Sequence, residues 1–221
     1  MESNYDISVE FGENRAFNFR TWRGQERRLL QEAQEKDKLS SNALADILVY
    51  GCMENPMYLN QDEILYVIHI LRKASFGTDI IVPFECECGH EESIVIQELQ
   101  NTTKQNLINV STGDKTFVIK QPSLTLESIG DIREKNQLEQ LYFEMLMHID
   151  HFIIGETKYD AFTTKDLDAF FDTSLGISDF DSALQQFSDM RFAFDPSVEI
   201  ECSACKEKTD IVIDYIDEIF N

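Results

Sequence analysis

Four of the five cysteines form two close pairs, and no other residues in the chain are as well placed to do chemistry. Cys86 and Cys88 lie in Phe-Glu-Cys-Glu-Cys-Gly-His, and Cys202 and Cys205 lie in Ile-Glu-Cys-Ser-Ala-Cys-Lys. The count is odd and the chain opens without the basic and apolar regions of a signal peptide, so we expect no export and no disulfide framework. Metal ligands or free thiols explain the pairs better.

The sequences around the two pairs repeat each other. Alternating apolar residues precede each pair, and the tripeptide Ile-Val-Ile follows each pair at the same distance, over 94–96 and 211–213. This pattern predicts a strand, a tight turn that carries two thiols, and a second strand. Gly89 suits such a turn because glycine takes a positive φ without a Cβ clash. Two such hairpin tips that face each other would supply four sulfur atoms.

We therefore predict that Cys86, Cys88, Cys202 and Cys205 bind one structural Zn²⁺ in a closed tetrahedron. Two alternatives stay open. The Cys-x-Cys pair is one residue shorter than the usual Cys-x-x-Cys, so His90 could replace one sulfur; the four residues could also be free buried thiols. Four protein ligands leave no position for a reactive water, so the site does not suggest hydrolysis. Cys52 has no partner at metal spacing, and we expect it to be a small buried apolar residue.

The rest of the chain lacks the common catalytic motifs. It has no glycine-rich phosphate loop, no Gly-x-Ser-x-Gly and no His-Glu-x-x-His. His148 and His151 are three positions apart on an expected helix, but no third ligand is evident, so we interpret them as a helix end that meets water. The aspartates at 179, 181 and 189 do not match a calcium loop. We predict that the protein is not an enzyme and has no small-molecule substrate.

The charge balance narrows the partners. Lys and Arg number 19 and Asp and Glu number 41, so the net charge is −22. Such a field repels phosphate backbones, which excludes nonspecific binding of nucleic acid. Residues 121–221 hold 22 acidic and seven basic residues, and they form either a docking surface for a basic partner or a solvated face. No apolar stretch approaches the length of a membrane span, so we expect a soluble protein.

The residue pattern predicts an α+β fold in which several β-hairpins pack with helices. The two cysteine hairpins form a zinc-ribbon-like clip around a helical insertion. We expect an N-terminal α+β part over 1–120, an acidic helical insertion over 121–194, and a second cysteine hairpin over 195–221 that closes back on the first. Hairpins are predicted over 5–22, 80–96, 107–120 and 198–215 and around residue 155, and a loop is predicted over 100–105. Helices are predicted over 24–36, 39–53, 126–136 and 137–152. Three further helices are predicted to follow the capping motifs at 60, 163 and 178.

The order of these elements resembles a phage family. The opening hairpin followed by Phe-Arg-Thr-Trp-Arg-Gly-Gln-Glu-Arg-Arg-Leu-Leu over 19–30 is similar to the start of the T-even-type myophage baseplate hub family. Leu-Arg-Lys-Ala-Ser-Phe-Gly over 71–77, which leads into the first cysteine hairpin, resembles its middle segment. The hairpin over 107–120 and the Gln-Pro-Ser-Leu that follows it resemble the next part. The cysteine pairs are not a fixed feature of the family, so the zinc prediction rests on this sequence.

The resemblance implies a noncatalytic subunit of the baseplate hub of a contractile-tail bacteriophage, or an assembly factor or chaperone for that hub. Its partners would be other hub and tail proteins. It would act in the host cytoplasm during assembly, and a place in the virion baseplate is the further option. The strip of Arg20, Arg23, Arg27 and Arg28 is the expected contact for an acidic partner. The alternative function is a cellular zinc-ribbon adaptor or an acidic DNA-mimic regulator.

Overall fold

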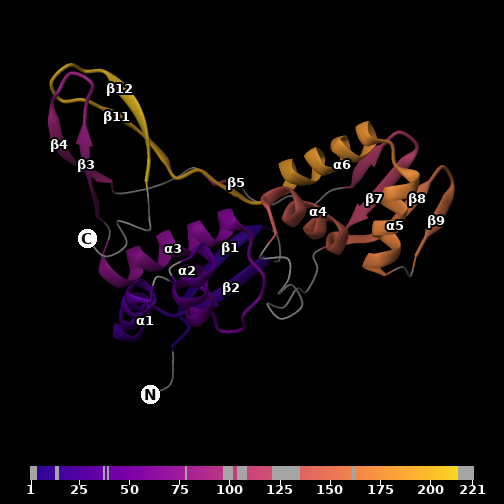
Figure 1. Cartoon of the computed structure of the whole chain (residues 1–221), viewed down its shortest axis with the longest axis horizontal. Helices are drawn as coiled ribbons and strands as arrows, with labels where there is room; N and C mark the ends of the chain where they lie inside the picture. Colours follow the sequence, from indigo (N-terminus) through magenta and orange to yellow (C-terminus); the bar gives the residue numbers. More distant parts are fainter. Residues whose placement is uncertain are drawn as a thin grey trace. The chain divides into compact units, whose positions relative to one another are not determined.

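The chain folds into two compact units, each with helices and small antiparallel sheets (Figure 1). The fold is therefore α+β, as expected. Unit 1 combines Met1–Thr103 with Ala193–Asn221, and unit 2 is Lys104–Phe192. This computed structural model describes residues 4–12, 15–36, 38, 40–77, 79–96, 102–103, 109–120, 135–160 and 163–213.

Unit 1 holds both cysteine hairpins and the helix near the N-terminus that carries Arg27 and Arg28. Its sheets each have two strands, pairing β1 with β2, β3 with β4, β10 with β5 and β11 with β12. Its elements are β1 (Ile7–Gly12), β2 (Arg15–Phe19), α1 (Gly24–Glu35), α2 (Ser41–Leu48), the 3₁₀ turn η1 (Tyr50–Cys52), α3 (Gln61–Phe76), β3 (Ile80–Glu85), β4 (Glu91–Ile96), β5 (Thr102–Thr103), β10 (Ala193–Phe194), β11 (Ser197–Glu201) and β12 (Lys208–Val212).

The start of α3 is fixed by a reciprocal cap and a buried ion pair. The Asn60 side chain accepts a hydrogen bond from the backbone N–H of Glu63, and the Glu63 carboxylate accepts one from the backbone N–H of Asn60. This is the expected capping box. Glu63 is fully buried, and the Arg15 guanidinium pairs with it. Because Arg15 belongs to β2, the pair ties the first hairpin to α3.

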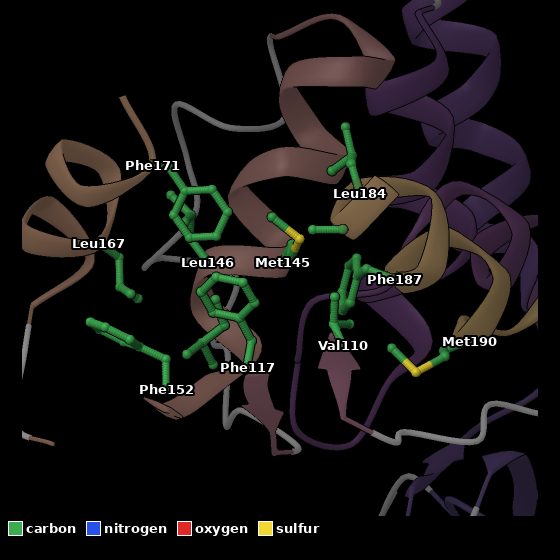
Figure 2. Packing of buried hydrophobic residues seen from close by; sticks show 12 residues of the cluster. Val110, Phe117, Met145, Leu146, Phe152, Leu167, Phe171, Leu184, Phe187 and Met190 are labelled. Carbon is green, nitrogen blue, oxygen red and sulfur yellow. The ribbon is translucent and has the colours of Figure 1, made fainter. Parts of the chain in front are cut away.

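Unit 2 is built on a four-stranded antiparallel sheet in the order β6-β7-β8-β9. Its elements are β6 (Val110–Thr112), β7 (Lys115–Ile119), α4 (Gln137–His148), β8 (Ile149–Ile154), β9 (Thr157–Tyr159), α5 (Thr164–Ser174) and α6 (Ile177–Met190). An aromatic-rich core joins the helices to the sheet. Figure 2 shows Phe117 of β7, Phe152 of β8 and Phe171 of α5 in this core, where the Phe117 ring centroid lies 5.1 Å from that of Phe171.

The boundary expected near residue 120 falls elsewhere in the structure. β7 pairs with β8 along its whole length, from Lys115 opposite Ile154 to Ile119 opposite Ile149. The hairpin of β6 and β7 therefore belongs to unit 2, which contains a sheet as well as helices. Thr102–Thr103 lies in the stretch predicted as a loop, yet it forms β5 and pairs with β10. The return of the chain at Ala193 supplies the partner strand, which local sequence could not show.

Two predicted helices were wrong at their ends. The helix predicted over 137–152 stops at His148, and Ile149–Ile154 is a strand. The β-branched isoleucines there favour a strand, and β7 supplies its pairing partner. The helix predicted over 39–53 ends at Leu48, and a 3₁₀ turn follows.

The remaining helix predictions differ in outcome. α6 begins at Ile177 with Gly176 as its N-cap, so the capping motif predicted at Ser178 lies inside the first turn. α5 begins after the Thr163 cap as predicted. The helix predicted over 126–136 lies outside the described residues except for its last two positions, which are not helical. In the described part of the chain, the helices are too short or too polar to cross a lipid bilayer.

Removing the Glu63 carboxylate should destabilise unit 1. We expect Glu63→Ala to lower the free energy of unfolding by about 3 kcal/mol, because the Arg15 charge would lose its buried partner. Trp22 is the single tryptophan and lies in unit 1, so denaturation followed by its fluorescence reports on this unit. The control Glu54→Ala removes an exposed carboxylate that accepts a hydrogen bond from Asn18, and should cost less than about 0.5 kcal/mol. An equal loss of unfolding free energy in the two variants would contradict the structural role of the buried pair between Arg15 and Glu63.

Candidate metal centre

The first cysteine hairpin is a regular antiparallel pair with a tight tip. β3 and β4 pair from Ile80 opposite Ile96 to Glu85 opposite Glu91. At the tip the Cys86 N–H donates to the His90 carbonyl at 2.9 Å, and Gly89 has φ +82°. A side chain at this position would be strained, so the glycine has the role expected from the sequence.

The second cysteine hairpin reproduces this tip with a different residue. β11 and β12 pair from Ser197 opposite Val212 to Glu201 opposite Lys208. The Cys202 N–H donates to the Glu207 carbonyl at 2.9 Å, as Cys86 does in the first hairpin. Lys206 has φ +65° and directly follows Cys205, as Gly89 directly follows Cys88. The two turns therefore share their first hydrogen bond and a positive φ after the second cysteine, although the second turn is one residue longer and lacks the glycine.

The tips of the two cysteine hairpins lie beside each other (Figure 1). This brings all four paired sulfur atoms together. The Cys86 and Cys205 sulfurs are 3.6 Å apart, and the Cys88 and Cys202 sulfurs are 3.8 Å apart. Each short contact joins one hairpin to the other, and all four sulfurs lie within 4.8 Å of one another. A metal ion with thiolate ligands at about 2.3 Å in a tetrahedron would place the sulfurs about 3.8 Å apart. The cluster therefore has about the size needed to hold one metal ion.

Buried apolar side chains pack against the sulfur cluster. Phe84 and Ile200 each lie two positions before the first cysteine of a pair, and they are buried together with Cys86 and Cys202. Cys88 and Cys205 are exposed. Each hairpin thus contributes one inner and one outer sulfur, and the partly buried residues that complete the packing are Ile94, Val198 and Ile211.

Backbone N–H groups point at the sulfurs and favour their charged form. The pKa of Cys202 is lowered to about 7, because the backbone N–H groups of Cys205 and Ala204 hydrogen-bond its sulfur. Cys86 receives a similar bond from the Cys88 backbone, but burial and the adjacent thiols outweigh it and raise its pKa to about 12. Sulfurs this close cannot all ionise without a cation among them.

His90 lies beside the cluster and contacts the opposite hairpin. Its Nε2 is 2.9 Å from the Ser203 hydroxyl, and the Ser203 N–H donates to the Glu92 carboxylate at 3.0 Å. That bond and a second one from Ser203 lower the pKa of Glu92. The four cysteines form the cluster without His90. No sequence signal indicates the contacts through Ser203, since they depend on how the two hairpins face each other.

The other residues singled out in the sequence lie elsewhere. Arg20 is only 7% exposed, and its guanidinium donates to Glu26 at 2.7 Å and to the Gly51 carbonyl at 2.8 Å. It is therefore not available for a partner, and Arg23, Arg27 and Arg28 are the exposed members of the predicted strip.

The isolated cysteine and the two histidines take structural positions. Cys52 is fully buried, as expected, and burial raises its pKa to about 12. His148 is buried with its Nδ1 2.7 Å from the Glu144 carbonyl, whereas the His151 ring contacts Asp150. Within the described residues, these two histidines do not join a metal-binding group.

Comparison with known families decides the relationship. The family described as T4 bacteriophage base plate protein matches residues 4–221. The chain belongs to this family. Membership supports a structural role in the phage baseplate, with other phage tail proteins as the partners that the family suggests. No curated protein and no solved structure matches the chain.

The sulfur cluster predicts a measurable metal content. The purified baseplate protein should hold one metal ion per chain by elemental analysis, and the double variant Cys202→Ser with Cys205→Ser should hold none, because half of the ligands are gone. His90→Ala is the matched control and should keep the full equivalent. A wild-type protein without metal, or a double variant that retains it, would contradict this assignment.

Proposed function

We propose that this protein is a noncatalytic subunit of the baseplate hub, or a factor that assembles the hub, and that it acts through contacts with other tail proteins. The family match over 4–221 carries this proposal, since it covers both units. It favours the phage function over a cellular zinc-ribbon adaptor or an acidic DNA mimic. The protein would meet its partners in the host cytoplasm and would remain in the baseplate if it is a hub subunit.

We further propose that the metal at Cys86, Cys88, Cys202 and Cys205 is a structural Zn²⁺. Four thiolates in a tetrahedral arrangement are the donor set that zinc takes in closed structural sites. The sulfur separations of 3.6 and 3.8 Å between hairpins fit that arrangement. Backbone N–H groups that hydrogen-bond the sulfurs would spread the charge of the thiolates. With four sulfur ligands the ion has no free position, so its role is to hold the chain together.

The zinc would hold together one segment that precedes unit 2 in the sequence and one that follows it. Cys88 and Cys202 are 114 positions apart, and the whole of unit 2 lies between them in the sequence. Two-stranded hairpins are marginally stable in water by themselves. The ion would therefore turn two weak hairpins into one rigid element that can present a fixed surface to a partner.

Opposite charges on the protein suggest two kinds of contact. The chain as a whole is acidic, which suits a basic partner surface and would speed its capture. Arg23, Arg27 and Arg28 instead form an exposed basic strip at the start of α1, where Arg28 lies 3.8 Å from Glu32. We propose that this strip binds an acidic surface of a second tail protein.

The basic strip can be tested by charge reversal in infected cells. We expect Arg27→Glu with Arg28→Glu to reduce co-purification with baseplate proteins, identified by mass spectrometry, by at least about tenfold. Lys158→Glu with Lys165→Glu is the matched control, because it changes the net charge equally in unit 2. Unchanged co-purification in the Arg variant would refute the strip. Failure of the wild type to co-purify any tail protein would refute the baseplate function.

A further inference from the structure

A groove of about 500 Å³ lies between the two cysteine hairpins. Its lining consists of two unbroken stretches, Glu92–Ile96 of β4 and Val198–Glu201 of β11. Successive residues of a strand point to opposite faces. A side-chain face would contribute only every second residue to the groove. Because consecutive residues line it, we infer that the groove runs along the backbone edges of the two strands.

The hydrogen-bond pattern of the second hairpin shows which groups this edge offers. The Cys202 N–H donates to the Glu207 carbonyl, and at the other end of the hairpin the Ile213 N–H donates to the Pro196 carbonyl. In an antiparallel pair every second residue bonds to the partner strand, so the bonded residues of β11 are the even-numbered ones. Glu199 and Glu201 occupy the positions between them. Their backbone N–H and C=O groups point away from β12, along the edge that lines the groove.

The first hairpin has the same alternation. The Cys86 N–H donates to His90, so the positions on β4 that point away from β3 include Ser93 and Val95. Pro83 lies opposite Ser93 and has no N–H. This agrees with the alternation, because the residues of this pair do not bond to each other and the proline therefore removes no hydrogen bond between β3 and β4. Pro83 also makes the outer edge of β3 a poor site for an added strand, because one N–H donor is missing there. The two stretches that line the groove contain no proline, so their edges keep all their N–H donors.

The charge around the groove selects what could occupy it. The lining holds three acidic residues, five aliphatic ones and no basic one. Lys206 and Lys208 contact Glu201 and Glu199 from β12 and its turn, but these pairs are exposed and contribute little. Together, residues 80–96 and 197–213 carry eight acidic and two basic residues. A second copy of the chain, with its own charge of −22, would be repelled.

We propose that an extended basic segment of a partner protein binds this groove as an added strand along the outer edges of β4 and β11, which pair with no further strand among the described residues. Backbone hydrogen bonds would supply the affinity, and alternate lysine or arginine side chains would meet the acidic residues while small apolar ones fill the groove. This assignment rests on the proposed function for the existence of a tail-protein partner, and it names the surface and the chemistry of one contact.

A peptide probe tests the groove without any phage component. The metal-loaded full chain is titrated into a dye-labelled, end-blocked peptide of sequence Lys-Val-Lys-Val-Lys-Val-Lys, and binding is followed by fluorescence anisotropy. We expect saturable binding with one peptide per chain. The same peptide with N-methyl groups on its three valines keeps its charge but loses backbone donors, and it should bind at least about tenfold more weakly.

A substitution on the protein provides the second arm. Ser93→Pro removes one edge N–H but no bond to β3, and should weaken the unmodified peptide at least about tenfold. Ser93→Ala keeps the N–H and should bind like the wild type. Metal content and circular dichroism of both variants establish that the hairpins are intact, and the N-methylated peptide tests the wild type itself if Ser93→Pro fails to fold.

The outcomes separate the groove from its alternatives. Equal binding of the two peptides would show that charge alone attracts them and would overturn the added strand. No saturable binding would also overturn it, as would a dimer in sedimentation that Ser93→Pro dissolves, since a second copy would then be the occupant. The baseplate function would survive each of these results, because co-purification with tail proteins tests it separately.

Discussion

The meeting of four sulfur atoms is the contact on which the cysteine hairpins depend. Each hairpin has two strands, and the shared packing around Phe84 and Ile200 is small. Sheets of this size are rarely stable without further support. A metal ion at the sulfurs would supply that support, because the free energy of metal binding becomes free energy of folding where the site forms only in the folded chain. The same ion would keep the groove between β4 and β11 in shape.

Both units combine an apolar core with buried ion pairs. Unit 2 buries a continuous cluster of large apolar residues, among them Phe117, Phe171 and Phe187, and its Arg191 pairs with the buried Glu144. Unit 1 also has buried ion pairs beside its apolar contacts. The pKa of Glu26 is lowered: its burial opposes this, but hydrogen bonds from the Arg20 side chain and the Arg23 backbone outweigh the burial. Buried pairs of this kind hold loops in fixed positions while contributing little net stability.

Local sequence signals predicted much of the fold and the main candidate site. The cysteine pairs with their flanking alternation predicted two hairpins whose tips meet, and the capping motif at Asn60 predicted the start of α3. Signals that depend on distant partners failed. The strand after His148 forms because β7 is beside it, and Arg20 is buried because Glu26 and the Gly51 carbonyl accept its hydrogen bonds. The positive φ of Lys206 and the place of the β11 edge beside the groove also follow from the tertiary arrangement, which periodicity does not encode.

Unit 1 is assembled from both ends of the chain, and this has a consequence for synthesis on the ribosome. Unit 2 is a continuous segment that can fold as soon as it emerges. Unit 1 must wait for β10 to pair with β5 and for β11 and β12 to reach β3 and β4. Cys202 and Cys205 leave the ribosome after all of unit 2, so the sulfur cluster forms only after unit 2 has been made. The surfaces that depend on this cluster therefore cannot form before residue 205 has been translated, and a chain that stops earlier could not present them.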